Sequence, residues 1–409
     1  MRKTTLHLGL DVHKDSITVA IAEGRRNGEV RIHSTISNDL HALEKLLTRL
    51  RKAHPGANFE TCYEAGPCGF GIARRLAQLG VPCEVVAPSL IPKRSGDRVK
   101  TDKRDAVKLA RLHRAGELTS VYIPEPTDEA IRDLCRARTD AVDDMKRSKH
   151  RMKSFLLRIG YRYQGGANWT PAHMRYLREL VLPHPAQKVI LEDYLMAIDA
   201  ARERIERCES SMRQLLETWR LKPAVESLMA FKGFQIVAAM ITVSELGDIH
   251  RFGHPRQLMA YLGLVGTEYS SGSKQRQGAI SRCGNAHLRW LLVECSQHYA
   301  TPPKVSKELS RRQVGQPRNV LAISWKAQNR LHSRFMKLAA RRLHRNKALV
   351  AIARELCGFP LGGPSLPSLL YCTISQRPDG RLQYDRGTLF PGPPYLRGTY
   401  LHAQHNAYN

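Results

Sequence analysis

Two aspartates lie three residues apart in the stretch KTDKRDAVKLA, at positions 102 and 105. Thr101 is a good helix N-cap, so a helix is predicted to begin there with Asp102 in its first turn. Residues three apart share one face of a helix, so the carboxylates of Asp102 and Asp105 would point the same way. Such a pair is either a solvated face neutralised by Lys103 and Arg104 and favoured by the helix dipole, or half of a site for divalent metal ions.

Two further carboxylates stand where predicted strands end. Asp11 closes the run LHLGLD, and Glu64 precedes a Gly-Pro that stops the strand FETCYE. Cleavage of a phosphodiester needs a nucleophile and stabilisation of charge on phosphorus, which two Mg²⁺ ions about 4 Å apart supply when carboxylates hold them. Asp11, Glu64, Asp102 and Asp105 therefore form a candidate site for one or two magnesium ions. The nearby Asp15 is interpreted as a turn residue.

The elements that must position these acids follow a regular order in residues 1–125. Apolar or alternating runs predict a meander of three antiparallel strands, broken at HKD and GRRNG. The predicted elements are strands over 6–12, 16–22 and 29–36, a helix over 40–50, a strand over 59–65, a helix over 72–80, a strand over 82–88 and the helix that opens at Thr101. This order is the one expected of a ribonuclease-H-like α/β domain.

Composition narrows the possible partners. The 409 residues allow two or three domains, and 42% hydrophobic residues allow a sizeable core. The net charge of +28 favours a polyanion. No apolar run is long enough to span a bilayer and the N-terminus turns polar too soon for a signal peptide, so nucleic acid rather than a membrane is the expected partner. The nine cysteines are scattered without a CxxC pair, which indicates reduced thiols in a cytosolic protein. The expected location is the cytoplasm of a bacterial-type cell, in association with the nucleoid.

The rest of the chain divides into three segments. Residues 126–222 predict two long amphipathic helices, the second over 194–219, which form either a coiled-coil arm for dimerisation or a helical bundle packed on its own domains. Residues 223–358 predict a mostly helical domain. Within it, positions 301–350 hold 13 Lys and Arg against one acid, which indicates contact with a polyanion. The Pro/Gly-rich residues 359–409 are interpreted as a flexible tail.

Two motifs in the helical domain could contact phosphate. Gly233 lies between two helical patterns, as in a helix-hairpin-helix, but Gln235 stands where a second glycine is usual, so a plain helix connection is the alternative. The block TEYSSGSKQRQGAISRCGNAHLRWLL is a basic Gly/Ser loop leading into a helix, suited to phosphate or simply exposed. The candidate nucleic-acid-binding cations here and in the basic segment are Lys274, Arg276, Arg282, Arg289, Arg311 and Arg312.

Three stretches carry a resemblance to a known family. GLDVHKDS, YEAGPCGFG and DRVKTDKRDAVKLARL resemble the three catalytic blocks of the DEDD-type insertion-sequence transposases. The likeness continues where an SG is followed by R-x-G-x-I and a GN-x-x-LR element, so it spans about Leu6 to Gly358. The resemblance implies a first domain similar to the RuvC-type Holliday-junction resolvases, a C-terminal transposase domain, and recombination guided by a bridge RNA.

In that family the serine before the glycine becomes joined to DNA. Carried over, this nucleophile is Ser271, with Ser270, Ser273 and Ser281 as rivals. The resemblance thus implies a composite site, in which the four carboxylates hold magnesium and the serine attacks the phosphate of element-end or target DNA. A site split between domains implies assembly across subunits, so a homodimer or homotetramer is expected.

Two other functions remain open. The first is a metal-dependent endonuclease or Holliday-junction resolvase, in which water attacks and the serine block only binds. The second is an architectural nucleic-acid-binding protein without chemistry. Cleavage without a covalent adduct would select the first, and binding without strand breakage would select the second.

Overall fold

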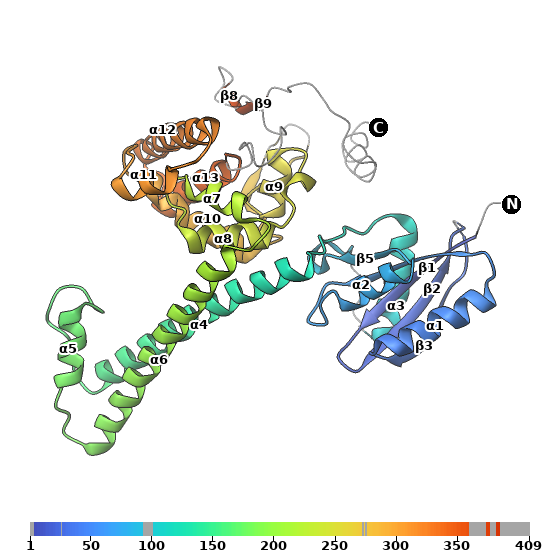
Figure 1. Ribbon diagram of the computed structural model, residues 1–409, viewed down its shortest axis with the longest axis horizontal. Helices are drawn as coiled ribbons and strands as arrows, with labels where there is room; N and C mark the ends of the chain where they lie inside the picture. The colour runs from blue at the N-terminus through green and yellow to red at the C-terminus, as the bar shows by residue number, and fades with distance from the viewer. Residues whose placement is uncertain are drawn as a thin grey trace. The chain divides into compact units, whose positions relative to one another are not determined.

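The computed structural model describes residues 4–25, 27–92, 101–271, 274, 276–359, 374–376 and 382–384. The chain separates into two compact units, Met1–Pro124 and Glu125–Asn409 (Figure 1). Among the described residues, no helix has both the length and the apolar character needed to cross a membrane. Most of the predicted tail lies outside the described residues, apart from the antiparallel strands β8 (Ile374–Gln376) and β9 (Leu382–Tyr384).

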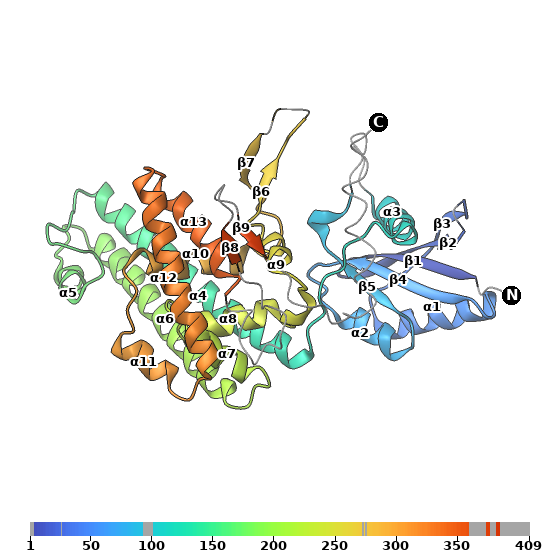
Figure 2. The ribbon, with the colours of Figure 1, turned by 90° about the horizontal axis from the view of Figure 1, so that it is seen from above.

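The N-terminal unit is a mixed five-stranded sheet in the order β3-β2-β1-β4-β5, with helices on both faces (Figure 2). Its elements are β1 (Thr5–Val12), β2 (Ser16–Glu23), β3 (Val30–Ser37), α1 (Leu40–Ala53), β4 (Asn58–Glu64), α2 (Gly71–Gln78), β5 (Cys83–Val86), the 3-10 turn η1 (Pro88–Leu90) and α3 (Asp102–Ala115). Every predicted strand and helix is confirmed, as is the antiparallel meander of β1, β2 and β3. The α/β class is therefore confirmed, and the narrower ribonuclease-H-like assignment stays a prediction.

Strand direction decides where the acids lie. β1 and β4 are parallel neighbours in which Leu10 pairs with Tyr63, so the next residues, Asp11 and Glu64, stand at the same edge of the sheet. Helices α1 and α2 bury leucines and isoleucine against one face of the sheet, which forms the larger core. Helix α3 covers the opposite face, and Thr101 caps it by accepting from the Arg104 amide at 3.4 Å. Its first turn thus comes to the edge where β1 ends.

Gly9 is the point of closest approach between α3 and the sheet. A Cβ at Gly9 would lie 2.3 Å from the Ala106 carbonyl oxygen and 2.4 Å from the Ala110 amide nitrogen. Both alanines are fully buried in a small cluster with alanines of β2. The helix backbone therefore rests directly on β1, and this contact sets the height of Asp102 and Asp105 above Asp11.

We expect Gly9→Ala to destabilise the N-terminal unit by about 1–3 kcal/mol, because the backbone of α3 must move to admit a methyl group. Hydrogen exchange of peptides from β1 and α3 measures the effect in the full chain. Gly71→Ala, in the first turn of α2, is the matched control, since a Cβ there meets no described atom within 4 Å. Equal protection of α3 in both variants would contradict the prediction.

The C-terminal unit is mostly helical, as predicted. Its elements are α4 (Pro126–Arg158), α5 (Pro171–Glu179), α6 (Pro185–Leu216), α7 (Lys222–Met229), α8 (Ile236–Leu246), η2 (Ile249–Arg251), α9 (Pro255–Tyr261), β6 (Gly266–Glu268), β7 (Gln277–Ile280), α10 (Ala286–Ser296), η3 (Gln297–Ala300), α11 (Lys307–Gln313), α12 (Arg318–Ala340) and α13 (Arg345–Leu356). One large core joins the start of α4 and the end of α6 to α7, α8, α10, α12 and α13.

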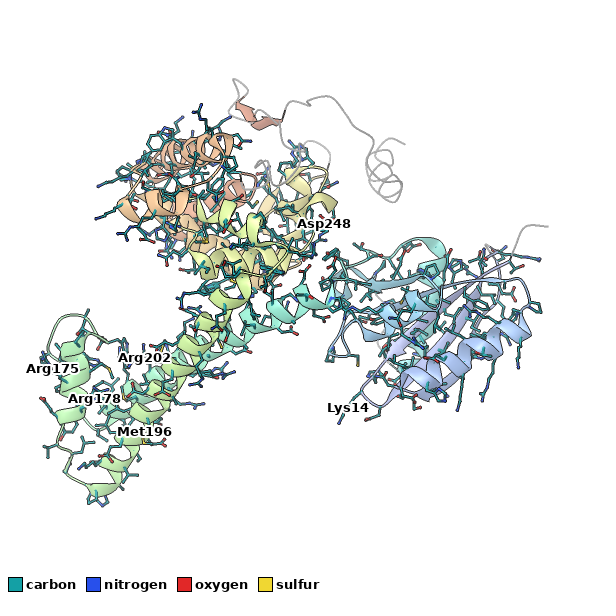
Figure 3. All side chains as sticks on the ribbon, in the orientation of Figure 1. Lys14, Arg175, Arg178, Met196, Arg202 and Asp248 are labelled. Atoms are coloured by element: carbon teal, nitrogen blue, oxygen red, sulfur yellow. The ribbon has the colours of Figure 1, made fainter. Side chains whose placement is uncertain are left out.

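Two long helices were predicted over residues 126–222, and α4 and α6 confirm them. Arg138 binds Glu209 across the pair at 2.8 Å. At the far end α5 packs on both helices around a separate apolar core, and Arg178 and Arg202 bind the same Asp199 at 3.4 and 2.9 Å (Figure 3). The arm thus has a core of its own within one chain. Its use as a coiled coil or dimerisation surface stays a prediction.

Three features of the C-terminal unit differ from the sequence-based expectation. The second long helix begins at Pro185 rather than at 194, and α5 was not predicted. The Gly/Ser loop expected after Thr267 is instead an antiparallel ribbon of β6 and β7. These strands have only three and four residues, so they give too little alternation for a strand prediction.

Candidate active site

Asp11 and Asp102 converge at the edge where β1 ends. Asp11 is mostly buried and Asp102 is exposed. Both carboxylates face the imidazole of His13, whose Nε2 lies 3.1 Å from Asp11 Oδ2 and 3.6 Å from Asp102 Oδ1. Asp105 is on the same turn of α3 and Glu64 ends the neighbouring strand, but neither belongs to the tightest group of potential ligand atoms among the described residues.

His13 is the residue that sequence reasoning missed. It stands two residues after Asp11, so the two side chains of an extended chain point to the same face. That periodicity could have identified it, although the HKD stretch was interpreted only as a strand break. It lies between the carboxylates of Asp11 and Asp102 and is hydrogen-bonded to Asp11.

The electrostatics of this edge fit a divalent cation. Burial raises the pKa of Asp11, hydrogen bonding and charge from His13 lower it, and the negative charges of Asp102 and Asp105 raise it again, with a net increase. Crowding of like charges in a partly buried place is unfavourable without a counter-charge. Two of the three nearest potential ligand atoms are carboxylate oxygens, the ligands that hard cations such as Mg²⁺ prefer, and the third is His13 Nε2. Asp11 and Asp102, with Asp105 and Glu64 beside them, could therefore hold such an ion.

Ser271 lies on the β6–β7 ribbon of the C-terminal unit. Its backbone exchanges two hydrogen bonds of 3.1 Å with Lys274, which closes the ribbon. The side chain is exposed, and no described residue is hydrogen-bonded to its hydroxyl. The rival Ser270 donates to Glu268 at 2.7 Å and accepts from the Arg276 amide, so its hydroxyl is already engaged. Ser273 lies outside the described residues.

The GN-x-x-LR element holds the base of this ribbon. Gly284 has a positive φ of 79°, and a Cβ there would lie 1.9 Å from the Tyr261 carbonyl oxygen. Asn285 caps α10 by accepting from the Leu288 amide at 2.9 Å. Arg289 donates to the carbonyls of Leu262 and Cys283, at 2.8 and 3.2 Å. The guanidinium of Arg289 is thus used to fix the loop, which leaves it less able to bind phosphate.

The other candidate cations differ in how far their side chains are exposed. Arg312 donates to the carbonyls of Met229 and Phe234 and is mostly buried. By contrast, the side chains of Lys274, Arg276, Arg282 and Arg311 are exposed. In the basic segment, Arg330 and Arg334 bind the buried Glu355, which lies just beyond it in sequence. The other exposed cations of this segment are Lys304, Lys307, Arg318, Lys326, Lys337, Arg341, Arg342, Arg345 and Lys347.

A buried carboxylate ties the ribbon's base to the helical core. The side chain of Glu245 of α8 is 1% exposed and binds Arg136 of α4 at 2.8 Å, Asn285 at 2.7 Å and His287 at 3.2 Å. Burial alone would raise the pKa of Glu245, but the hydrogen bonds from His287, Arg136 and Asn285 and the charge of Arg136 outweigh it and bring the pKa to about 2.

We expect Glu245→Ala to lower the free energy of unfolding of the C-terminal unit by about 3 kcal/mol at neutral pH, because three donors lose their acceptor. Since the folded pKa is below the ordinary 4.5, this stabilisation is present above pH 4.5 and is lost as pH falls toward 2. Tryptophan fluorescence during denaturation reports on this unit alone, because all four tryptophans follow Glu125. Glu226→Ala, in a half-exposed pair with Lys222, is the control and should cost far less, because solvent screens an exposed ion pair. A smaller loss for Glu245→Ala than for this control would contradict the prediction.

Comparison with known proteins identifies the family. Residues 8–160 match a family model described as a transposase, and residues 225–311 match the model of the transposase IS116/IS110/IS902 family. A putative transposase of Sinorhizobium fredii, y4qE, is 40% identical over 352 residues, which cover 86% of each chain. The chain belongs to this transposase family. The transposase for insertion sequence element IS1533 of Leptospira borgpetersenii is 28% identical and is matched over 83% of this chain and 98% of its own length.

Membership confirms the prediction of a DEDD-type insertion-sequence transposase. The protein is therefore a DNA transposase, an enzyme of a mobile element that acts on DNA. The first matched region contains the end of β1 with Asp11, and the whole of β4 and α3, which carry the other acids. The second contains the β6–β7 ribbon with Ser271. The DEDD-type domain implies dependence on a divalent metal ion.

Proposed function

We propose that this transposase cuts and rejoins DNA through a covalent bond between Ser271 and a DNA phosphate. The observation that carries the proposal is the exposed serine hydroxyl, unengaged by any described residue, on a ribbon whose exposed cations Lys274 and Arg276 suit a phosphate backbone. Ser270, the nearest described rival, is already hydrogen-bonded through its hydroxyl. An exposed nucleophile on a protruding ribbon suits a substrate as large as duplex DNA (Figure 2).

The chemistry conserves the energy of the broken bond. Ser271 Oγ attacks phosphorus and loses its proton to water, while the bond to the 3′ oxygen breaks and that oxygen takes up a proton. The resulting phosphoserine has nearly the energy of the original diester, so a 3′-hydroxyl of another strand can attack it and release the serine without ATP. Strand exchange follows when the attacking hydroxyl comes from a different DNA molecule.

In this proposal Asp11, Asp102, Asp105 and Glu64 hold Mg²⁺. Bound there, the ion would stabilise negative charge on the phosphate and on the leaving oxygen. His13 hydrogen-bonds Asp11 and so fixes the orientation of its carboxylate. The short distances among Asp11, His13 and Asp102 support this assignment, and the negative charges of Asp102 and Asp105 near the partly buried Asp11 are consistent with it.

A structured guide RNA and a homo-oligomer complete the proposal. Both rest on the family resemblance, together with the net charge of +28 and the exposed cations of α12 and α13. Trp325 is about half exposed on α12 among these cations, where an indole can stack on an unpaired base. Three large apolar side chains in the first half of α6 are exposed, Val189 at 64%, Ile190 at 39% and Met196 at 71% (Met196 is labelled in Figure 3), and such a set suits a contact between subunits.

The test is a denaturing gel of the full chain incubated with Mg²⁺, its co-purifying RNA and end-labelled element-end and target DNA. A labelled band that migrates with the protein and disappears after protease treatment is the expected result. Nicked DNA without such a band would select a metal-dependent nuclease or resolvase, in which Asp11 and Asp102 suffice and water attacks. Binding without strand breakage would overturn both enzymatic mechanisms.

A further inference from the structure

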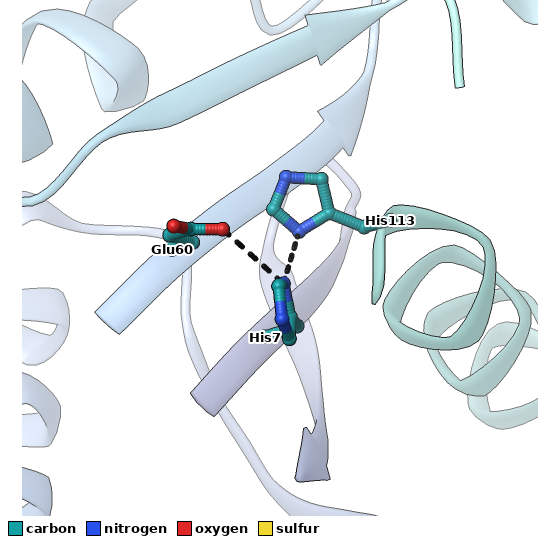
Figure 4. A group of neighbouring side chains, drawn as sticks. All are labelled: His7, Glu60 and His113. Carbon is teal, nitrogen blue, oxygen red and sulfur yellow. Dashed lines mark hydrogen bonds and ion pairs between the residues drawn. The ribbon is translucent and has the colours of Figure 1, made fainter. Parts of the chain in front are cut away.

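A second group of potential metal ligands lies under the other end of α3. His7 of β1, Glu60 of β4 and His113 in the last turn of α3 point toward one another (Figure 4). His7 Nδ1 lies 3.3 Å from His113 Nδ1 and 3.4 Å from Glu60 Oε2. His7 and Asp11 are four residues apart on one strand, so the two groups are separated by about 13 Å. The histidine group is therefore distinct from the carboxylates that we assign to catalysis.

The spacing of these atoms matches a tetrahedral cation. Zn²⁺ binds histidine nitrogen and carboxylate oxygen at about 2.0–2.1 Å, which in a tetrahedron places two donor atoms about 3.4 Å apart. The observed separations of 3.3 and 3.4 Å agree with that value. All three donor atoms lie within 4.8 Å of one another. A ligand set of two histidine nitrogens and one carboxylate oxygen favours the binding of zinc over that of magnesium.

We propose that His7, Glu60 and His113 bind a Zn²⁺-class divalent cation, with water in the remaining position. The two imidazoles are largely buried, whereas Glu60 is 46% exposed and offers a route from solvent. The ion would join β1, β4 and the end of α3, which are the elements that carry Asp11, Glu64 and Asp102. It would thereby fix α3 on the sheet. This inference does not depend on the serine mechanism.

The surroundings support this assignment. Burial lowers the pKa of His7 and of His113, which favours the neutral imidazole that binds metals. Glu84 Oε2 lies 3.9 Å from His113 Nε2 and accepts from Ser120 at 2.9 Å. A carboxylate near the free nitrogen of a ligating histidine commonly orients the ring. The competing explanation is a plain hydrogen bond between the two Nδ1 atoms, with no affinity for metal.

The experiment titrates Co²⁺ into the full chain, carrying no polyhistidine tag and stripped with chelator, and records the visible spectrum. Tetrahedral Co²⁺ absorbs strongly there, whereas Co²⁺ on an oxygen-rich octahedral site absorbs weakly, so the two sites of the unit are distinguishable. In the wild type we expect strong visible bands and no near-ultraviolet band of the kind that a thiolate ligand gives. The visible bands should disappear when Zn²⁺ is added and displaces Co²⁺. His7→Ala and His113→Ala should abolish them, and Glu60→Gln should weaken Co²⁺ affinity about tenfold or more.

Two controls sharpen the result. His33→Ala removes a histidine of β3 outside the group, and Asp11→Asn removes a carboxylate of the other site. Both should keep the strong bands. Bands that persist in His7→Ala and His113→Ala, or weak bands only in the wild type, would overturn the proposal. Because Glu60 is half exposed, Glu60→Gln is expected to fold even where a histidine variant does not. A Co²⁺ affinity of Glu60→Gln equal to that of the wild type would also overturn the proposal.

Discussion

Replacing Asp11 by asparagine should reduce DNA strand cleavage at least about a thousandfold, because several kcal/mol of charge stabilisation are lost and each 1.4 kcal/mol corresponds to about tenfold in rate. Asparagine has nearly the same size as aspartate, so the sheet edge is retained and only the charge is removed. The side chain of Asp11 is 15% exposed, against 61% for Asp102, so its charge is the less screened of the two. DNA binding should change little, since the exposed cations of the chain are untouched. Single-turnover cleavage of labelled DNA in Mg²⁺, with fluorescence anisotropy for binding, measures both.

Asp15→Asn is the matched control for Asp11→Asn. Asp15 is an exposed acid in the same turn between β1 and β2, and its backbone carbonyl accepts from the Asn38 amide at 3.1 Å. The two variants carry the same change of net charge, so any general electrostatic effect on DNA affinity is shared. Cleavage within about tenfold of wild type in Asp11→Asn would remove the carboxylate site from the mechanism. An equal loss of cleavage in Asp15→Asn would instead indicate that removing a negative charge from this turn lowers the rate, whether or not the residue is a metal ligand.

The N-terminal unit was predictable because each of its signals is local. The meander alternates apolar and polar residues, the turns contain glycine and charge, and Thr101 with two acids marks the start of a helix. Because β1 and β4 are parallel, their ends bring Asp11 and Glu64 to one edge of the sheet. The helix that carries the D-x-x-D motif, α3, then needs only to lie over that edge. The distance between Asp11 and Asp102 was not predictable, since it depends on how deeply α3 sits on Gly9.

What the sequence could not indicate are contacts between distant residues. Arg289 binds the Leu262 carbonyl 27 residues away and Arg312 binds carbonyls about 80 residues away, so the sequence predicted both only as candidate nucleic-acid-binding cations. His7 and His113 are 106 residues apart and meet only because α3 crosses β1. Glu245 lies in an apolar stretch of sequence. Its partners belong to α4 and α10, so nothing near Glu245 in the sequence indicates that its carboxylate is buried and hydrogen-bonded. In each case the missing information is three-dimensional packing rather than residue type.

Ser271→Ala should abolish the protein–DNA adduct and strand joining while leaving DNA binding and folding intact. The hydroxyl makes no hydrogen bond to a described residue, and the ribbon is closed by backbone bonds to Lys274, so alanine removes only the nucleophile. Hydroxyl loss eliminates covalent catalysis outright, so the expected adduct yield is at background. The denaturing gel measures the adduct, mass spectrometry of the protease-digested adduct locates the modified serine, and tryptophan fluorescence checks the fold.

Ser270→Ala and Ser273→Ala are the matched controls for the serine assignment. Ser270→Ala removes a hydroxyl that holds Glu268 and the Arg276 amide, so it should lower the adduct yield by loosening the ribbon but should leave the adduct on Ser271. An adduct that survives Ser271→Ala and disappears in Ser273→Ala would move the nucleophile two residues along. Nicking that continues unchanged in all three variants, with no adduct in any, would leave water as the nucleophile. In that outcome Asp11 and Asp102 would carry the cleavage alone, and the ribbon would serve only to bind DNA.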